Sequence, residues 1–180
     1  MTNESTKFIL YACPVGELGQ QLETYFKESL ERCGANTAHQ YMPHCTLTGF
    51  FEDKQQAAMR YVAALKSALA QQLPQQPIPV AEIRQLSFHE NWHGLELTAP
   101  WFQSVAQTFA SLAKSPSPLR LKTWLHVSLA YGFDPTLAKP LKQMALHIVD
   151  PQIPVDWELR LYQRQSNWHC HYYYLLTSVR

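Results

Sequence analysis

The chain has 180 residues, of which 46% are hydrophobic and 16% are charged, and its formal net charge is +1. This is the composition of a soluble globular protein, long enough for one domain with a sizeable core or for two small halves packed together. The near-neutral charge argues against a broad electrostatic surface for long nucleic acids, but it is compatible with a small anionic ligand in one pocket.

The N-terminal residues contain neither a basic region nor an apolar run long enough for a secretion signal, and no stretch approaches a membrane span. We therefore expect a cytoplasmic monomer without a membrane partner. Four scattered cysteines form no C-x-x-C pair, which argues against zinc and redox chemistry. Cys45 follows a histidine on a predicted strand, where neighbours point to opposite faces, so we expect it in the core.

The first half of the chain predicts two strands and two helices. Residues 7–14 form a buried apolar strand, and the following helix repeats leucine or phenylalanine every fourth residue as far as Gly34. Residues 44–51 predict the second strand, and Asp53 is placed to cap the second helix. That helix runs into QQLPQQPIP at 71–79, which we interpret as a hinge between lobes.

The second half adds hairpins to the same order. It contains, in chain order, a hairpin of residues 80–88 and 94–99, a helix that ends at Ser-Pro-Ser-Pro (115–118), a strand at 124–133, a helix, and a hairpin of 154–163 and 168–179. Asp134 is placed to cap that last helix, with Pro135 in its first turn.

Each half thus contains a strand, a helix, a strand that begins with histidine, and a helix, which indicates an internal repeat. We predict an α/β fold of the α+β type in one bilobal domain, residues 1–180, with sequence halves of about 1–75 and 76–180. Two antiparallel-sheet lobes with approximate two-fold symmetry should face a central cleft, with a histidine strand at the middle of each sheet and the helices outside.

The two histidine strands carry the same motif, HCTL at residues 44–47 and HVSL at 126–129, and their histidines are 82 residues apart. From the residue frequencies, about 0.1 match to H-x-[S/T]-L is expected by chance in this chain. Two matches at corresponding places in a repeat are therefore not accidental.

The motif spacing suits phosphodiester chemistry. Residues i and i+2 of a strand share a face, so each motif presents an imidazole beside a hydroxyl. Hydrolysis of a phosphodiester needs a base for the attacking water, an acid for the leaving oxygen, and donors for the phosphoryl oxygens. Histidine titrates near neutrality, so His44 and His126 are candidates for acid and base. The two motifs are nearly equivalent, and the sequence leaves open which histidine is the base.

These segments resemble the paired H-x-T/S motifs of the two-histidine (2H) phosphoesterase superfamily. PHCT at 43–46 and HVSLAYG at 126–132 are most similar to plant- and yeast-type cyclic phosphodiesterases, and YACP at 11–14 resembles their aromatic-Ala-x-Pro opening. The resemblance covers the order of elements along nearly the whole chain, whereas residue-level matching is confined to these three segments.

The resemblance implies a bilobal, metal-independent hydrolase without a cofactor, in which His44 and His126 are acid and base and Thr46 and Ser128 bind phosphate. The implied substrates are nucleoside 2′,3′-cyclic phosphates or ADP-ribose 1″,2″-cyclic phosphate, which link such enzymes to RNA and tRNA-splicing metabolism.

Two tyrosines carry over as substrate contacts, Tyr131 and Tyr11. Simple strand alternation places Tyr131 on the face opposite His126, so it reaches the cleft only through a bulge or at the strand end.

Other functions compete with this interpretation. One is an RNA-end phosphodiesterase or 2′-5′ RNA ligase-like enzyme, which would need a local basic groove from Arg84, Arg120, Lys122, Arg160 and Arg164. Another is a non-catalytic nucleotide-binding module that uses the same four motif side chains. His169 and His171 could chelate a metal from one strand face, but no carboxylate or cysteine arrangement completes a site, so we predict none.

Overall fold

The computed structural model describes residues 5–73 and 81–177. Its strands are β1 (Ser5–Val15), β2 (Cys45–Thr46), β3 (Phe51–Lys54), β4 (Glu82–His89), β5 (Trp92–Thr98), β6 (Leu125–Tyr131), β7 (Asp156–Arg164) and β8 (Trp168–Leu176). Its α-helices are α1 (Gly16–Cys33), α2 (Ala58–Gln72), α3 (Pro100–Leu112) and α4 (Ala138–Ile148). The expected hinge at 71–79 lies mostly outside the described residues.

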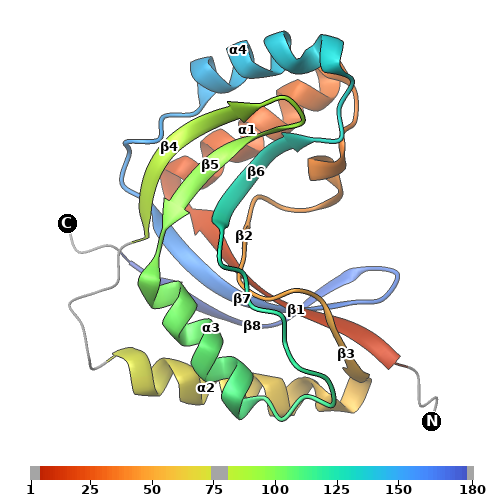
Figure 1. Ribbon diagram of the computed structural model, residues 1–180, viewed down its shortest axis with the longest axis vertical. Coiled ribbons are helices and arrows are strands. Elements are labelled where there is room, and N and C mark those ends of the chain that lie inside the picture. Colours follow the sequence, from red (N-terminus) through yellow and green to blue (C-terminus); the bar gives the residue numbers. More distant parts are fainter. Residues whose placement is uncertain (1–4, 74–80, 178–180) are drawn as a thin grey trace.

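All these strands belong to one antiparallel sheet, in the order β4-β5-β6-β2-β1-β7-β8, with β3 also paired to β1. The sheet is strongly curved, and its two ends form two lobes (Figure 1). Helices α1 and α4 cover β4, β5 and β6, whereas α2 and α3 pack on the lobe of β1, β7 and β8. The predicted bilobal α+β fold is confirmed, with one difference: the lobes share a continuous sheet, joined by the two-residue strand β2.

The central strands explain the repeat in the sequence. The order β5-β6-β2-β1 is symmetric about the β6–β2 pair, so the two histidine-bearing segments are neighbours. They do not occupy the middles of two separate sheets. Each helix pair joins one helix from each sequence half, since α1 packs on α4 and α2 on α3. Each lobe is therefore built from both halves of the sequence.

Most helix signals in the sequence correspond to the structure. Leu18 and Leu22 are completely buried along one face of α1, and Gly34, with a φ of 78°, ends that helix by donating to the Leu30 carbonyl. Asp134 caps the turn before α4 by accepting from the Thr136 backbone N–H.

The predicted cap by Asp53 is wrong. This residue lies in β3, and its carboxylate binds Arg60 and Tyr61 on α2 instead of the helix's first N–H groups.

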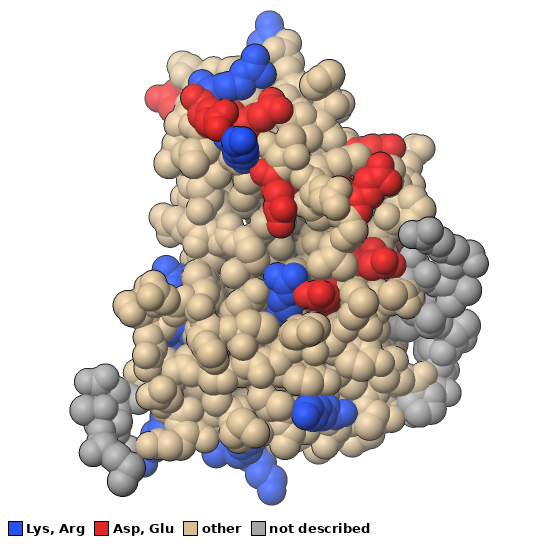
Figure 2. All heavy atoms as spheres, turned by 180° about the vertical axis from the view of Figure 1, so that it is seen from behind, with Lys and Arg blue, Asp and Glu red and all other residues tan. Residues whose placement is uncertain are grey.

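Charges are spread over the molecule. On the face seen in Figure 2, acidic side chains gather over one lobe, whereas basic side chains are scattered from end to end. Such a mixed surface agrees with the net charge of +1 and offers no broad basic track on this face. None of the described helices is long and apolar enough to cross a membrane.

Candidate active site

The two motifs meet across the β2–β6 pair. Cys45 lies opposite Val127 in an antiparallel register, and both side chains are completely buried. This register sets His44 beside Ser128 and Thr46 beside His126 on the other face of the sheet. Each imidazole therefore has the hydroxyl of the opposite motif as its cross-strand neighbour. The prediction that Cys45 is a core residue is confirmed, and burial raises the pKa of its thiol to about 12.

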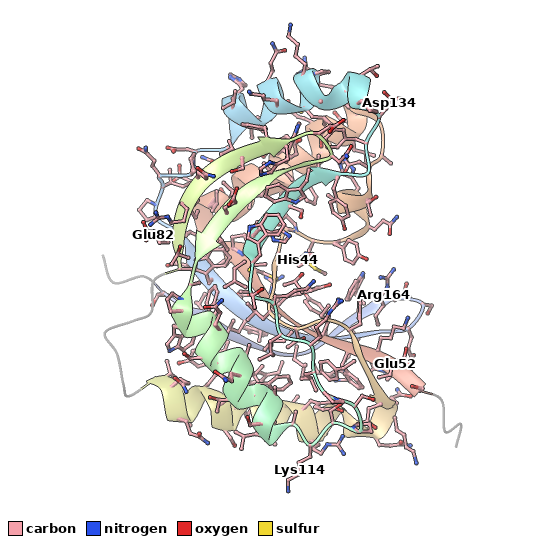
Figure 3. All side chains as sticks on the ribbon, viewed as in Figure 1. His44, Glu52, Glu82, Lys114, Asp134 and Arg164 are labelled. Atoms are coloured by element: carbon pink, nitrogen blue, oxygen red, sulfur yellow. The ribbon has the colours of Figure 1, made fainter. Side chains whose placement is uncertain are left out.

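All four motif side chains line one cavity of about 270 Å³. Figure 3 shows His44 near the centre of the molecule, between the two lobes. The remaining lining residues come from the segments on both sides of the strand pair: Phe26, Ala38, Tyr41, Met42, Trp92, Lys122 and Tyr131. The cavity lining combines polar and aromatic side chains, which suits a compact anion attached to an organic group.

His44 is held in one orientation. Its Nδ1 lies 2.7 Å from the carbonyl oxygen of Met42, and because a carbonyl only accepts, Nδ1 carries the proton and Nε2 is left as the acceptor. The ring also stacks on Tyr11 at 3.9 Å between centroids. Burial lowers the pKa of His44 to about 4, against the raising effect of the Met42 carbonyl. At neutral pH this imidazole is an uncharged base.

His126 lies between two indoles. The Trp124 ring is 4.0 Å from the imidazole centroid, and the Trp92 ring meets it edge-on at 5.2 Å. Burial lowers the pKa of His126; the Trp124 backbone opposes this shift and the Lys122 charge adds to it. Among the described residues, Nδ1 of His126 has no hydrogen-bond partner of ordinary geometry.

Ser128 is oriented by Trp92. The indole Nε1–H donates to Ser128 Oγ at 2.9 Å, so the hydroxyl proton remains available for an acceptor in the cavity. Gly94 makes this contact possible. A Cβ at Gly94 would lie 2.4 Å from both the Trp92 ring and the Val127 carbonyl oxygen. Trp92 lies outside both motifs, and its contact with Ser128 depends on the β5–β6 pairing.

Tyr131 reaches the cavity through a bulge in β6. The β5–β6 register shifts between the pairs Gly94–Ser128 and His93–Ala130, so that Leu129 is the extra residue. Because the bulge reverses the alternation, Tyr131 returns to the face of Ser128 and lines the cavity. This is the arrangement that a substrate contact by Tyr131 requires.

Tyr11 has a different position from the one predicted. Its side chain is only 1% exposed and it is not among the cavity-lining residues. It lies behind His44 in a small cluster with Ile9, Cys13 and Tyr162 on the same face of the sheet. The stacking of the Tyr11 ring on His44 favours a supporting role for Tyr11 over a direct substrate contact, which stays a prediction.

The basic residues predicted for a groove are divided between the cavity and other parts of the surface, and Arg164 donates to Tyr41 of the cavity lining. Lys122 lines the cavity, whereas Arg84 pairs with Glu82 and Arg160 pairs with Glu158. Lys122 is held in place by its backbone N–H, which donates to the Leu47 carbonyl. Lys122 lies four residues before His126 and was considered only as part of that groove.

His169 and His171 lie outside the cavity, and the Nε2 atom of His171 bonds to the Gln163 amide oxygen. Within residues 5–73 and 81–177, no three histidine, cysteine or acidic side chains form a group that could hold a metal ion.

The sequence has relatives among larger proteins. It is 28% identical over 185 residues to the ecdysteroid-phosphate phosphatase of Bombyx mori, covering 98% of this chain and 27% of the relative. It is 29% identical over 173 residues to the human ubiquitin-associated and SH3 domain-containing protein B, covering 92% of this chain and 26% of that protein. The chain therefore spans about a quarter of the length of the curated relatives it matches. No protein-family model matches the chain.

The fold has a solved counterpart in Escherichia coli LigT, a 2H phosphoesterase whose crystal structure contains ATP. The two chains superpose with a TM-score of 0.52 at 15% identity, over 97% of this chain and 100% of LigT. A closer placement beside the plant- and yeast-type cyclic phosphodiesterases stays a prediction. The paired motifs, their meeting across β2–β6 and the match to LigT identify this chain as a protein of the 2H phosphoesterase fold.

Proposed function

We propose that this chain is a metal-independent phosphodiesterase that opens cyclic phosphates on nucleotides. The observation that carries the proposal is the cavity in which two imidazoles and two hydroxyls from neighbouring strands face one small volume. At about 270 Å³ this cavity is at the lower end of ligand-site sizes, which suits a ribose with its cyclic phosphate.

The environments of the two histidines favour one division of roles. His44 has the lower pKa and an unprotonated Nε2, so it accepts the proton of the attacking water. His126 keeps the higher pKa of the two, and the negative charge of a bound phosphate favours its protonated form. As water bonds to phosphorus, the bond to one ribose oxygen breaks, and His126 protonates that oxygen.

The remaining polar groups hold the phosphate. The Thr46 and Ser128 hydroxyls donate to the non-bridging oxygens, and Trp92 fixes the direction of the Ser128 donor. Lys122 supplies the positive charge at the edge of the cavity. Tyr131 lies on the cavity wall, where it contacts the organic part of the substrate. Tyr11 supports the His44 ring from behind.

The names of the relatives do not decide the substrate. The phosphatase of Bombyx mori is a much longer protein, and this chain matches only 27% of it. The name of that protein therefore does not assign a phosphatase activity to the matched part. LigT was solved with ATP, which supports a nucleotide as the class of ligand.

The deciding experiment is a turnover assay of the purified chain. The panel contains the four nucleoside 2′,3′-cyclic phosphates, ADP-ribose 1″,2″-cyclic phosphate, a linear phosphomonoester and a short RNA with a cyclic-phosphate end. We expect hydrolysis of the cyclic phosphates, with 2′- or 1″-monophosphates as products, and its loss in H44A and H126A. Nucleotide binding without turnover would instead indicate a non-catalytic module, and activity or ligation confined to RNA would indicate an RNA-end enzyme.

A further inference from the structure

Beside the cavity lies a group of three aromatic rings around one arginine, which we call the Arg164 cluster: Tyr41, Phe50, Arg164 and Trp168. The Arg164 guanidinium carbon lies 5.0 Å from the Trp168 ring centroid, 5.5 Å from that of Tyr41 and 5.9 Å from that of Phe50. Its Nη1 also donates to the Tyr41 hydroxyl at 3.4 Å. The guanidinium is thus held over aromatic faces, an arrangement that leaves the N–H groups on its outer edge free to donate to an acceptor.

Arg164 differs from Arg60 and Arg160 in its ion pairing. Within the described residues, Arg60 pairs with Asp53 and Arg160 pairs with Glu158, whereas no acidic side chain lies within ion-pair distance of Arg164. A guanidinium that has no anionic partner in the described part of the chain and lies beside the proposed phosphate-binding cavity is suited to a second anion.

The cluster connects the cavity to a larger open groove. Tyr41 lines the cavity and lies 5.6 Å from the His44 ring. Trp168 contacts Tyr41 at 5.7 Å and stacks on Phe50 at 6.0 Å. Phe50 and Arg164 then line a groove of about 720 Å³. Figure 3 shows the same order, with Arg164 farther than His44 toward the β7–β8 hairpin.

The side chains of the Arg164 cluster are too exposed to serve only as packing in the core. Phe50 is 39% exposed, and Arg164 and Trp168 are only half-buried. Lys7, directly opposite Arg164 in the β1–β7 pair, adds a second basic side chain to the groove, although Glu52 faces it at 3.9 Å. Exposed aromatic faces beside cationic donors are the features on which nucleobases stack and phosphates bind.

We propose that the Arg164 cluster is a second subsite, which binds a nucleobase and the phosphate linking it to the ribose that carries the cyclic phosphate. The proposal rests on the proposed function, because it supplies the part of the substrate that a cavity of about 270 Å³ does not hold. The linking group is a phosphodiester in a dinucleotide and a diphosphate in ADP-ribose cyclic phosphate. Both present a base and an anion next to the reacting ribose, and both are preferred over a mononucleotide.

The test compares kcat/KM for three substrates: adenosine 2′,3′-cyclic phosphate, the dinucleotide ApA with a terminal 2′,3′-cyclic phosphate, and ADP-ribose 1″,2″-cyclic phosphate. The wild type should prefer one or both extended substrates over the mononucleotide by about 5- to 150-fold, the range expected for one stacked base. The extended substrate with the larger preference identifies the linking group. Equal kcat/KM values for all three would overturn the proposal.

Variants separate the subsite from general damage. In R164Q and in the double variant F50L/W168L, the ratio of extended to mononucleotide kcat/KM should fall toward one. R84Q is the matched control, since Arg84 is an exposed arginine on β4 paired with Glu82, and it should keep the wild-type ratio. If R164Q lowers all substrates equally, the cluster is only structural and the proposal is wrong.

A binding measurement keeps the inference testable if no substrate is turned over. Calorimetry would then compare adenosine 2′-phosphate with ApA carrying a terminal 2′-phosphate, on the wild type and on R164Q. Tighter binding of the dinucleotide by the wild type, lost in R164Q, would support the subsite while the hydrolytic function fails. Equal affinities would reject the subsite as well.

Discussion

The indole Nε1 of Trp92 donates a hydrogen bond of 2.9 Å to the hydroxyl oxygen of Ser128, and this bond decides which way that hydroxyl points. Trp92→Phe keeps an aromatic ring and removes the donor. One net hydrogen bond is worth about 0.5 to 1.5 kcal/mol, so kcat/KM should fall about 2- to 10-fold with little change in melting temperature. In an S128A background the same substitution should have almost no further effect. If Trp92→Phe lowered kcat/KM in the S128A background as much as in the wild type, Trp92 would act through another group.

Gly94 is the second element of this arrangement. In Gly94→Ala the new methyl group would meet the Val127 carbonyl and the Trp92 ring at 2.4 Å, and both belong to the β5–β6 contact behind the site. We expect a loss of about 1 to 3 kcal/mol in unfolding free energy, measured by urea denaturation, together with reduced turnover. Gly49→Ala is the control: its Cβ would meet only the flexible Arg120 side chain, at 3.0 Å, and no backbone atom. Equal effects of the two substitutions would refute this account.

The pH dependence follows from the two imidazoles. His44 must be neutral, so kcat/KM should fall as the pH decreases through about 4. His126 must be protonated, and because its pKa is lowered from the usual value near 6.5, kcat/KM should fall again as the pH rises through that lower value. The optimum should therefore lie on the acidic side of neutrality. H126A should lose the basic limb of the profile, whereas loss of the acidic limb in H126A would reverse the assigned roles.

Substitutions of the motif histidines and of the motif hydroxyl residues should affect different kinetic parameters. H44A or H126A removes a proton-transfer partner and should lower kcat about 10²- to 10⁴-fold, and the double variant should be far less than multiplicatively worse. T46A or S128A removes a hydrogen bond to an anionic oxygen, worth about 1.5 to 3 kcal/mol, so KM should rise as well as kcat fall. Circular dichroism should show all four variants folded. Near-normal turnover in a folded histidine variant would disprove the mechanism.

Activity should survive a metal chelator, because the cavity residues supply acid, base and phosphate donors by themselves. The measurement is kcat/KM before and after EDTA and gel filtration, with a metalloenzyme as positive control. If EDTA abolished turnover, a divalent ion restored it, and H169A/H171A prevented that restoration, a metal would be assigned to the neighbouring His169 and His171.

The sequence predicted the architecture well, because the relevant signals are local. Apolar periodicity, the stop at Gly34 and the cap at Asp134 each depend on residues within a few positions of one another. The motif residues could be predicted for the same reason, since i and i+2 share a strand face. Asp53 differs from the predicted cap because Arg60 and Tyr61 bind its carboxylate in place of the helix N–H groups.

The rest of the site depends on register, which the sequence does not reveal. The bulge at Leu129 brings Tyr131 to the cavity, and the neighbouring sequence contains no signal that predicts this bulge. The β4–β5 turn is only two residues long, so Trp92 and His93 belong to β5 rather than to the connection expected between residues 88 and 94, and His93 is buried. Tyr11 lies in the predicted strand. Its side chain is covered by contacts with Met42 and His44, which belong to a segment about 30 residues away in the sequence.

The exchange of helices between the sequence halves has a consequence for folding. Because α1 packs on α4 and α2 packs on α3, neither half contains a complete lobe, and the Cys45–Val127 contact joins residues 82 positions apart. Such distant contacts form only after long loops have closed, so the site should assemble in the last cooperative step rather than in a preformed unit. Fragments 1–75 and 76–180, expressed separately, should each remain unfolded, and catalysis should return only when the two are combined.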